Sequence, residues 1–83
     1  MSYKVLQGIE HLKEIDTAVS ICFDVETLQL QPEQGKLRLI QLGCQVRQII
    51  VVIDCFELNE SDWDVLGRFF SNGNRFWLAH NAV

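Results

Sequence analysis

Two carboxylates two positions apart are the residues of this chain most able to do chemistry. Asp24 and Glu26 stand in the run Phe23-Asp24-Val25-Glu26-Thr27. Side chains alternate along a strand, so both carboxylates would share one face, while Phe23 and Val25 would anchor the other face in a core. Neighbouring carboxylates repel each other unless cations neutralise them. The pattern therefore predicts a site for Mg²⁺ or Mn²⁺, which prefer oxygen ligands and can assist phosphodiester cleavage. On its own, the Asp-x-Glu pattern is weak evidence for a metal site, since it also fits two solvated carboxylates at an exposed strand end.

The segments around this pair predict a sheet. Residues 18–26 are rich in β-branched and aromatic side chains, as is typical of a strand, and residues 37–44 and 48–54 predict two more. The link between the last two is short enough for a hairpin. Residues 3–6 predict a further short strand. These three main strands are expected to form an antiparallel meander.

The remaining segments predict helices and a final strand. Apolar residues at helical spacing in residues 8–15 predict a short amphipathic helix. Asn59 and Ser61 are candidate N-caps for a second helix that ends near Phe70. Residues 75–80 predict a strand, which the helical crossover should place parallel to an earlier one. The expected fold is therefore an α/β fold: a three-stranded antiparallel meander, a helix, and then a parallel strand.

Size and composition restrict the classes of protein that fit. The chain has 83 residues, 48% hydrophobic, which predicts a single globular domain over residues 1–83. Its net charge of −4 gives it no basic surface for phosphate, so bound metal ions would have to mediate contact with a nucleic acid. Without a signal peptide or an apolar run long enough to cross a membrane, the expected location is the cytoplasm.

The cysteines, histidines and aromatic residues have ordinary structural explanations. Cys22, Cys44 and Cys55 are odd in number and form no C-x-x-C pair, so buried reduced thiols are expected; a disulfide or a zinc site is the alternative. His11 is expected to be solvated. The periodicity of the aromatic residues favours a core role over a base-stacking platform. These residues are Trp63, Phe69, Phe70, Phe76 and Trp77.

Several motifs in order resemble the DEDD superfamily of 3′–5′ exonucleases, in particular ribonuclease D and the proofreading domain of bacterial DNA polymerase I. The run Phe23 to Thr27 matches the first family motif, Phe-Asp-x-Glu-Thr. Arg-Leu-Ile-Gln-Leu at residues 38–42 matches the next family strand, and Ile53-Asp54 ends the following one. His-Asn-Ala at residues 80–82 matches the start of the second motif. The resemblance extends from about Val19 to Val83.

The resemblance implies a fold, a cofactor and a set of site residues. The family fold is ribonuclease H-like, a mixed sheet of five strands flanked by helices, and this chain would supply its N-terminal half. Asp24 and Glu26 would be catalytic metal ligands for Mg²⁺ or Mn²⁺. Thr27 and Leu30 would seat the 3′-terminal nucleotide, and the substrate would be the 3′ end of single-stranded RNA or DNA. His80 and Asn81 would support the substrate without binding metal.

The departures from the family leave two functions open. The third carboxylate of the family falls two positions after the residue aligned with Val83, and the third motif lies further on. Gln29 replaces a glycine beside the substrate strand. One hypothesis is that the chain is part of a metal-dependent exonuclease, with weak metal binding and no activity alone. The missing half would come from a second chain or would have been lost by truncation. The other is a non-catalytic interaction module that self-associates. Both predict a homo-oligomer, because the strand at residues 75–80 would be an open sheet edge.

Overall fold

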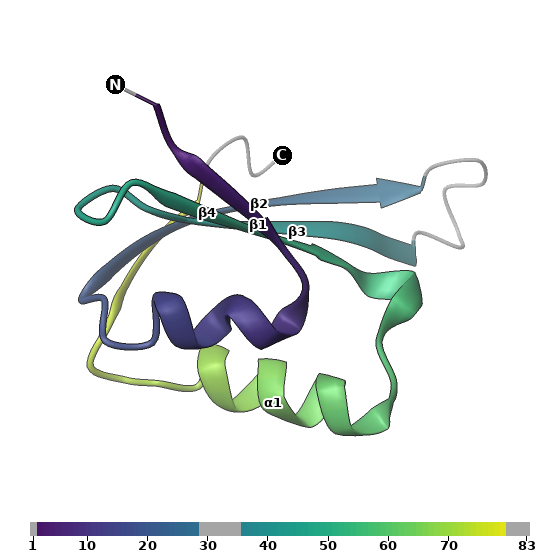
Figure 1. Cartoon of the computed structure of the whole chain (residues 1–83). Coiled ribbons are helices and arrows are strands. Elements are labelled where there is room, and N and C mark those ends of the chain that lie inside the picture. The colour runs from purple at the N-terminus through teal and green to yellow at the C-terminus, as the bar shows by residue number, and fades with distance from the viewer. Residues whose placement is uncertain (1, 29–35, 80–83) are drawn as a thin grey trace.

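The computed structural model describes residues 2–28 and 36–79, which form one mixed sheet with helices on one side only (Figure 1). The strands run in the order β1-β4-β3-β2-β5. No helix of the described residues is long and apolar enough to cross a membrane. In chain order the elements are β1 (Lys4–Gln7), the 3-10 helix η1 (Ile9–Glu14), β2 (Ser20–Leu28), β3 (Lys36–Cys44), β4 (Ile49–Asp54), the 3-10 turn η3 (Cys55–Glu57), α1 (Glu60–Phe70) and β5 (Phe76–Ala79).

The predicted meander and parallel final strand are both confirmed. Strands β2, β3 and β4 pair antiparallel with their neighbours in sequence, with Phe23 opposite Leu42 and Ile40 opposite Ile53. Helix α1 then carries the chain under the sheet, and β5 pairs in parallel with β2. Strand β2, which carries the carboxylate pair, is therefore held on both sides by hydrogen-bonded neighbours.

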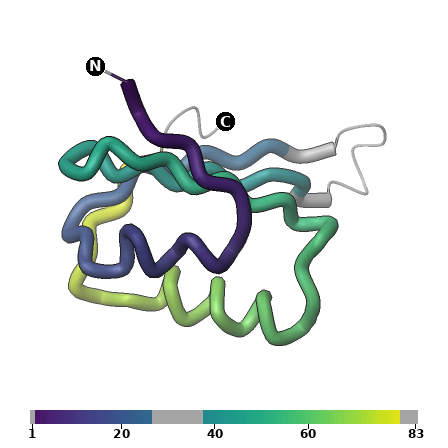
Figure 2. Tube along the Cα trace, in the orientation of Figure 1, coloured from purple at the N-terminus to yellow at the C-terminus, as the bar shows by residue number. Residues whose placement is uncertain are grey.

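The first strand occupies a position that the sequence pattern does not indicate. Strand β1 pairs in parallel with β4, so that the sheet has five strands. The Lys4 N–H donates to the Gln48 carbonyl at 2.8 Å and the Gly8 N–H donates to the Val52 carbonyl at 3.0 Å. The trace in Figure 2 follows β1 across the sheet and then turns beneath it into η1. Strands β1 and β5 are thus the two edges of the sheet.

Both predicted helices form, one of them with a different geometry. Residues 9–14 make a 3-10 helix instead of an α-helix, and Leu12 and Ile15 are buried as the apolar spacing predicts. Helix α1 begins after Asn59, the first of the two candidate caps. The Asn59 side chain accepts from the Asp62 N–H at 2.8 Å, and the Asp62 carboxylate accepts from the Asn59 N–H at 3.1 Å. This reciprocal pair satisfies two backbone donors that a helix start otherwise leaves free.

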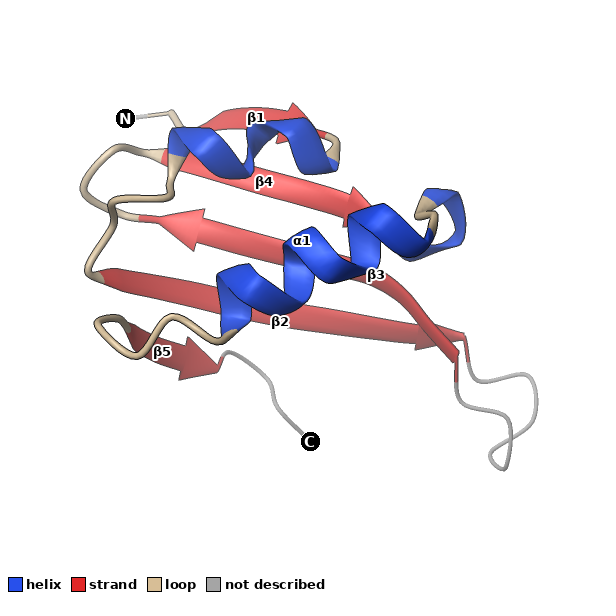
Figure 3. Cartoon of the chain, turned by 90° about the horizontal axis from the view of Figure 1, so that it is seen from below, coloured by secondary structure: helices blue, strands red, loops and turns tan. Residues whose placement is uncertain are grey.

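The core lies between the helices and one face of the sheet, which Figure 3 shows from the helix side. Ile21, Leu42, Val51 and Ile53 project into it and are fully buried. The opposite face, here called the open face, has no element over it among the described residues (Figure 1). By the strand registers, an apolar row crosses this open face from edge to edge. Its members are Leu78, Cys22, Gly43, Ile50 and Val5.

Two expectations about burial are wrong. Phe76 and Trp63 are 71% and 43% exposed, and Phe76 projects onto the open face. Phe69, Phe70 and Trp77 belong to the core as expected.

Arg75 connects the last strand to the rest of the fold. Its side chain is only 7% exposed and lies over the Phe69 ring, with 4.2 Å between the guanidinium carbon and the ring centroid. It donates to the carbonyls of Ala18 at 2.9 Å and Phe69 at 3.3 Å, and to that of Asp16. One side chain therefore connects the chain entering β2, the end of α1 and the start of β5.

Candidate metal-binding site on the open face

Asp24 and Glu26 project onto the open face, because Phe23 and Val25, which alternate with them along β2, face the helices. Ile21 is fully buried under the helices, and the Phe23 ring lies 6.3 Å from that of Phe70 on the same side. Alternation along β2 then places both carboxylates on the opposite face, as the sequence predicts. Val25 faces the helix side but remains 44% exposed, so it anchors the core less than expected.

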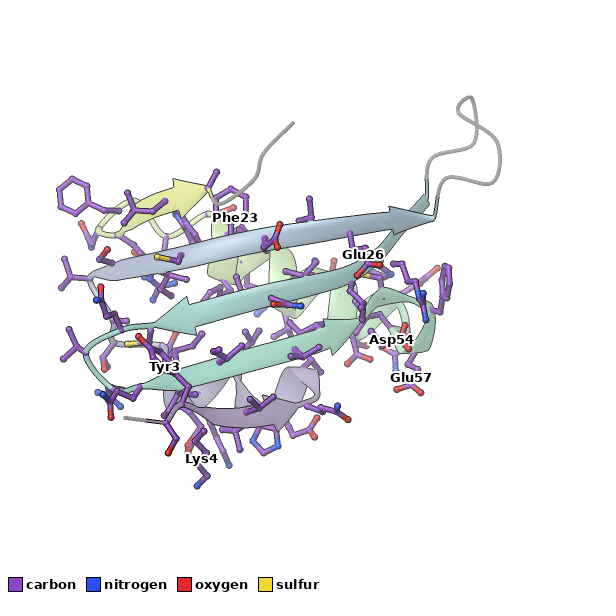
Figure 4. The ribbon with its side chains drawn as sticks, turned by 90° about the horizontal axis from the view of Figure 1, so that it is seen from above. Tyr3, Lys4, Phe23, Glu26, Asp54 and Glu57 are labelled. Carbon is purple, nitrogen blue, oxygen red and sulfur yellow. The ribbon has the colours of Figure 1, made fainter. Side chains whose placement is uncertain are left out.

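The neighbours of the two carboxylates on the open face are mostly uncharged. Asp24 stands opposite Gln41, and Glu26 stands opposite Leu39, which in turn faces Asp54 of β4. Figure 4, which looks onto this face, shows Glu26 and Asp54 near the same end of the sheet. Two strand spacings of about 4.8 Å separate them. The Asp54 carboxylate accepts from the Phe56 N–H at 3.0 Å, and among the described residues it is not grouped with the pair as a third ligand.

A β-bulge lies beside Glu26. Glu26 pairs with Leu39 and Thr27 pairs with Leu37, which leaves Arg38 as an extra residue in β3. A bulge of this kind bends its strand and changes the direction of nearby side chains, and bulges are common beside active sites. The spacing of residues in the sequence did not reveal it, because a bulge depends on the pairing of two strands.

The structure brings together the two predicted metal ligands and describes little of the other site residues. Thr27 lies in β2, directly after Glu26. Leu30, His80 and Asn81 fall outside the described residues, so their expected roles beside the nucleotide stay predictions. Within residues 2–28 and 36–79, no three His, Cys, Asp or Glu side chains are grouped closely enough to hold a metal ion.

Asp24 and Glu26 are ligands of the type that a divalent cation prefers, but two ligands are too few to complete its coordination. Both groups are carboxylates, the ligands that Mg²⁺ and Mn²⁺ prefer. Among the described side chains, His11 Nε2 lies 3.7 Å from Glu10 Oε1, and neither Asp24 nor Glu26 forms an ion pair with a described cation. A Mg²⁺ ion takes about six oxygen ligands. Two carboxylates can therefore begin a metal site, and water or groups outside the described residues must complete it.

A separate cavity of about 420 Å³ lies at the end of the sheet where η1, η3 and α1 converge. Leu39 and Val52 contribute to its lining, together with the carboxylates of Glu10, Asp54, Glu57 and Asp62. Neither Asp24 nor Glu26 lines it. Sequence reasoning did not find this cavity, because its walls come from four segments that are far apart along the chain. No three of the described His, Cys, Asp or Glu side chains are grouped closely enough here to hold a metal ion.

The cysteines divide into one exposed and two buried thiols, all of them free. The expectation of burial is confirmed for Cys44 and Cys55 and is wrong for Cys22, which projects from β2 onto the open face. Burial raises the pKa of the Cys55 thiol above its ordinary value of 9.0, and the neighbouring Asp54 carboxylate raises it further. Cys55 is therefore a neutral, inert thiol at physiological pH.

Comparison with known proteins identifies the fold. No protein-family model and no curated protein matches the chain. Among solved structures, it is similar to the EXO domain of Nibbler from Aedes aegypti, with a TM-score of 0.76 and 19% identity over 95% of this chain. It is also similar to the catalytic core of RRP6 from Trypanosoma brucei, with a TM-score of 0.72 and 19% identity over 96% of this chain. The chain covers only 38% and 23% of these two structures. The likeness shows the fold: the chain has part of a ribonuclease H-like fold, as these two structures do.

Proposed function

We propose that this chain supplies two metal-binding carboxylates, Asp24 and Glu26, to a 3′–5′ exonuclease that acts on the ends of single-stranded RNA or DNA. The observation that carries the proposal is their position. They occupy successive outward positions of the interior strand β2, on the open face of a fold shared with exonuclease domains. An enzyme that binds a substrate phosphate there must first neutralise these two charges, and divalent cations do so.

The residues of this chain would prepare the site for hydrolysis. Asp24 and Glu26 would hold Mg²⁺ or Mn²⁺, which when bound can activate a water and stabilise the leaving oxygen. Because the chain has a net charge of −4, the metal ions would also provide the attraction for phosphate that the protein lacks. Thr27 and Leu30 would contact the terminal nucleotide, with His80 and Asn81 in supporting positions. The remaining metal ligands would come from groups outside the described residues, such as those of a second chain.

Titration with Mn²⁺ tests the metal site directly. Paramagnetic broadening of NMR signals should centre on residues 24 to 26 and should saturate only at high Mn²⁺, since two carboxylates supply few of the ligands. The variants Asp24→Asn and Glu26→Gln should each remove most of the broadening. Asp64→Asn, which changes an exposed carboxylate on α1, is the matched control and should leave it unchanged. Broadening that centres elsewhere and survives both substitutions would rule out the pair as a metal site.

A non-catalytic interaction module is the second candidate function. The observation in its favour is the apolar part of the open face, which no described element covers and where Phe76 and Leu78 are 71% and 54% exposed. A monomeric soluble protein rarely exposes large contiguous apolar patches. The Mn²⁺ titration separates the two candidates, because an interaction module needs no metal at Asp24 and Glu26.

A further inference from the structure

The bulge in β3 is the one irregularity among the strand pairings that the structure describes, and it lies beside a proposed metal ligand. The registers of the other three pairings run without a shift. In the β2–β3 pairing, Glu26 stands opposite Leu39. The next residue of β2, Thr27, stands opposite Leu37, so Arg38 is an extra residue between two regular pairs.

Arg38 is not needed to hold the two strands in register. On the other side of β3, strand β4 ends at Asp54, opposite Leu39, so Arg38 has no partner residue in either neighbouring strand of the described sheet. Without Arg38, Leu37 would directly precede Leu39 and the same pairs would form an unbroken ladder. A bulge interrupts such a ladder and redirects a side chain. The side chain that this bulge adds beside the proposed site is a guanidinium.

The guanidinium of Arg38 is available to a ligand. Arg38 is exposed, and among the residues that the structure describes its side chain forms neither an ion pair nor a hydrogen bond. Its Cα atom is one residue from that of Leu39, which stands opposite Glu26, so the Cα atoms of Arg38 and Glu26 lie within about 10 Å of each other. An arginine side chain can therefore contact a group that is bound at Glu26.

No other described cation is placed to do the same. The remaining basic side chains that the structure describes belong to the helices under the sheet, to the opposite end of the sheet, or to the core. These residues are Lys4, Lys13, Arg47, Arg68 and Arg75. Arg38 is thus the described basic residue closest to the two carboxylates along the sheet.

We propose that Arg38 binds the phosphate of the nucleotide at the Asp24–Glu26 site, an inference that rests on the proposed function. Divalent cations at the two carboxylates attract one side of a phosphate, and its remaining oxygens need donors. A guanidinium supplies two parallel N–H groups that match two phosphate oxygens. Because the chain has a net charge of −4, this one cation beside the site contributes attraction that the rest of the surface does not. The bulge is the feature that places it there.

Titration with adenosine 5′-monophosphate (AMP) tests the phosphate contact, since a 3′–5′ exonuclease releases nucleoside 5′-monophosphates. At high Mg²⁺, AMP should shift the Nε–Hε NMR signal of Arg38 in the 83-residue chain and leave that of Arg68 in place. Arg38→Gln should weaken AMP binding about tenfold, because it removes a charge-assisted hydrogen-bond donor. Arg68→Gln changes an exposed arginine of α1 and is the matched control, with unchanged affinity. Equal AMP affinities of Arg38→Gln and the wild type, or no AMP binding by the wild type, would overturn the proposal.

Deletion of Arg38 separates the charge from the bulge. The deletion removes both and keeps every described strand pair, whereas Arg38→Gln keeps the bulge and removes only the charge. Both variants should lose AMP affinity to the same extent, and Arg38→Lys should recover part of it. Loss of affinity in the deletion alone would assign the effect to the backbone of the bulge and contradict a guanidinium contact.

Mn²⁺ broadening distinguishes failure of this inference from failure of the proposed function. In Arg38→Gln, broadening should remain centred on residues 24 to 26, because Arg38 binds phosphate and not metal. Normal broadening together with an AMP affinity that does not depend on Arg38 would remove this inference alone. Absence of broadening at residues 24 to 26 in the wild type would remove the proposed metal site and the phosphate contact with it.

Discussion

At the scale of single residues, the chemistry of this chain depends on which face of the sheet a side chain takes. In β2, Asp24 and Glu26 reach solvent on the open face, while Phe23 between Cys22 and Asp24 packs under the helices. The same alternation exposes Cys22 and buries Cys44. The sequence predicted the common face of the carboxylates, because alternation is a local property of strands. It could not predict that no described element covers the face of Cys22, since such cover depends on elements distant along the chain.

The buried thiol of Cys55 should make the stability of the chain dependent on alkaline pH. Its folded-state pKa is raised above 9.0 by burial and by Asp54, so the folded chain holds this proton more tightly than the unfolded chain. The resulting stabilisation is complete below pH 9.0 and is lost as pH rises through the folded pKa. Urea unfolding at about pH 7 to about pH 10 should therefore show that Cys55→Ala loses less stability on alkalinisation than the wild type.

The exposed thiol supplies the control for this experiment. Cys22→Ala removes a thiol that the fold does not bury, and its loss of stability with pH should parallel that of the wild type. If Cys55→Ala also paralleled the wild type throughout the alkaline range, the thiol would have the same proton affinity in the folded and unfolded chains. The assignment of a perturbed, buried Cys55 would then be wrong.

At the scale of elements, the sequence predicted most strands and helices but not how distant ones pair. The meander, the N-cap at Asn59 and the parallel final strand follow from local patterns and connection lengths. The 3-10 geometry of residues 9–14 was missed, because the apolar spacing of a 3-10 turn is close to that of an α-helix. The pairing of β1 with β4 and the bulge at Arg38 were missed because both depend on contacts between separate segments. The same holds for the candidate site: the common face of Asp24 and Glu26 follows from local alternation, whereas the bulge beside Glu26 depends on strand pairing.

The connection between β2, α1 and β5 should depend strongly on Arg75. Arg75→Met keeps much of the apolar length of the side chain but leaves the carbonyls of Asp16, Ala18 and Phe69 without their donor. Loss of buried, charge-assisted hydrogen bonds should lower the free energy of unfolding by about 2 kcal/mol or more. Chemical denaturation followed by Trp fluorescence measures this change. Arg68→Met, at an exposed position of α1, should change stability by less than about 0.5 kcal/mol.

At the scale of the whole molecule, the described residues form a sheet with helices packed against one face only. The core fills the space between the helices and the sheet, and the carboxylates and the apolar row lie on the opposite face, which no described element covers. The proposed metal ligands and the exposed apolar row therefore lie on the same face. Whatever covers the open face must leave Asp24 and Glu26 accessible if the chain is to act on a phosphodiester.

This arrangement predicts that the isolated 83-residue chain has no measurable exonuclease activity. Asp24 and Glu26 alone cannot hold two metal ions about 3.5–4 Å apart in a fixed geometry. Among the described residues, no third carboxylate, histidine or cysteine joins them. Incubation with 3′-labelled single-stranded RNA and DNA in the presence of Mn²⁺ should leave the label in place, with Asp24→Ala indistinguishable from the wild type. Progressive shortening that disappears in Asp24→Ala would show instead that the chain assembles a complete site, for which a second copy would have to supply the missing ligands.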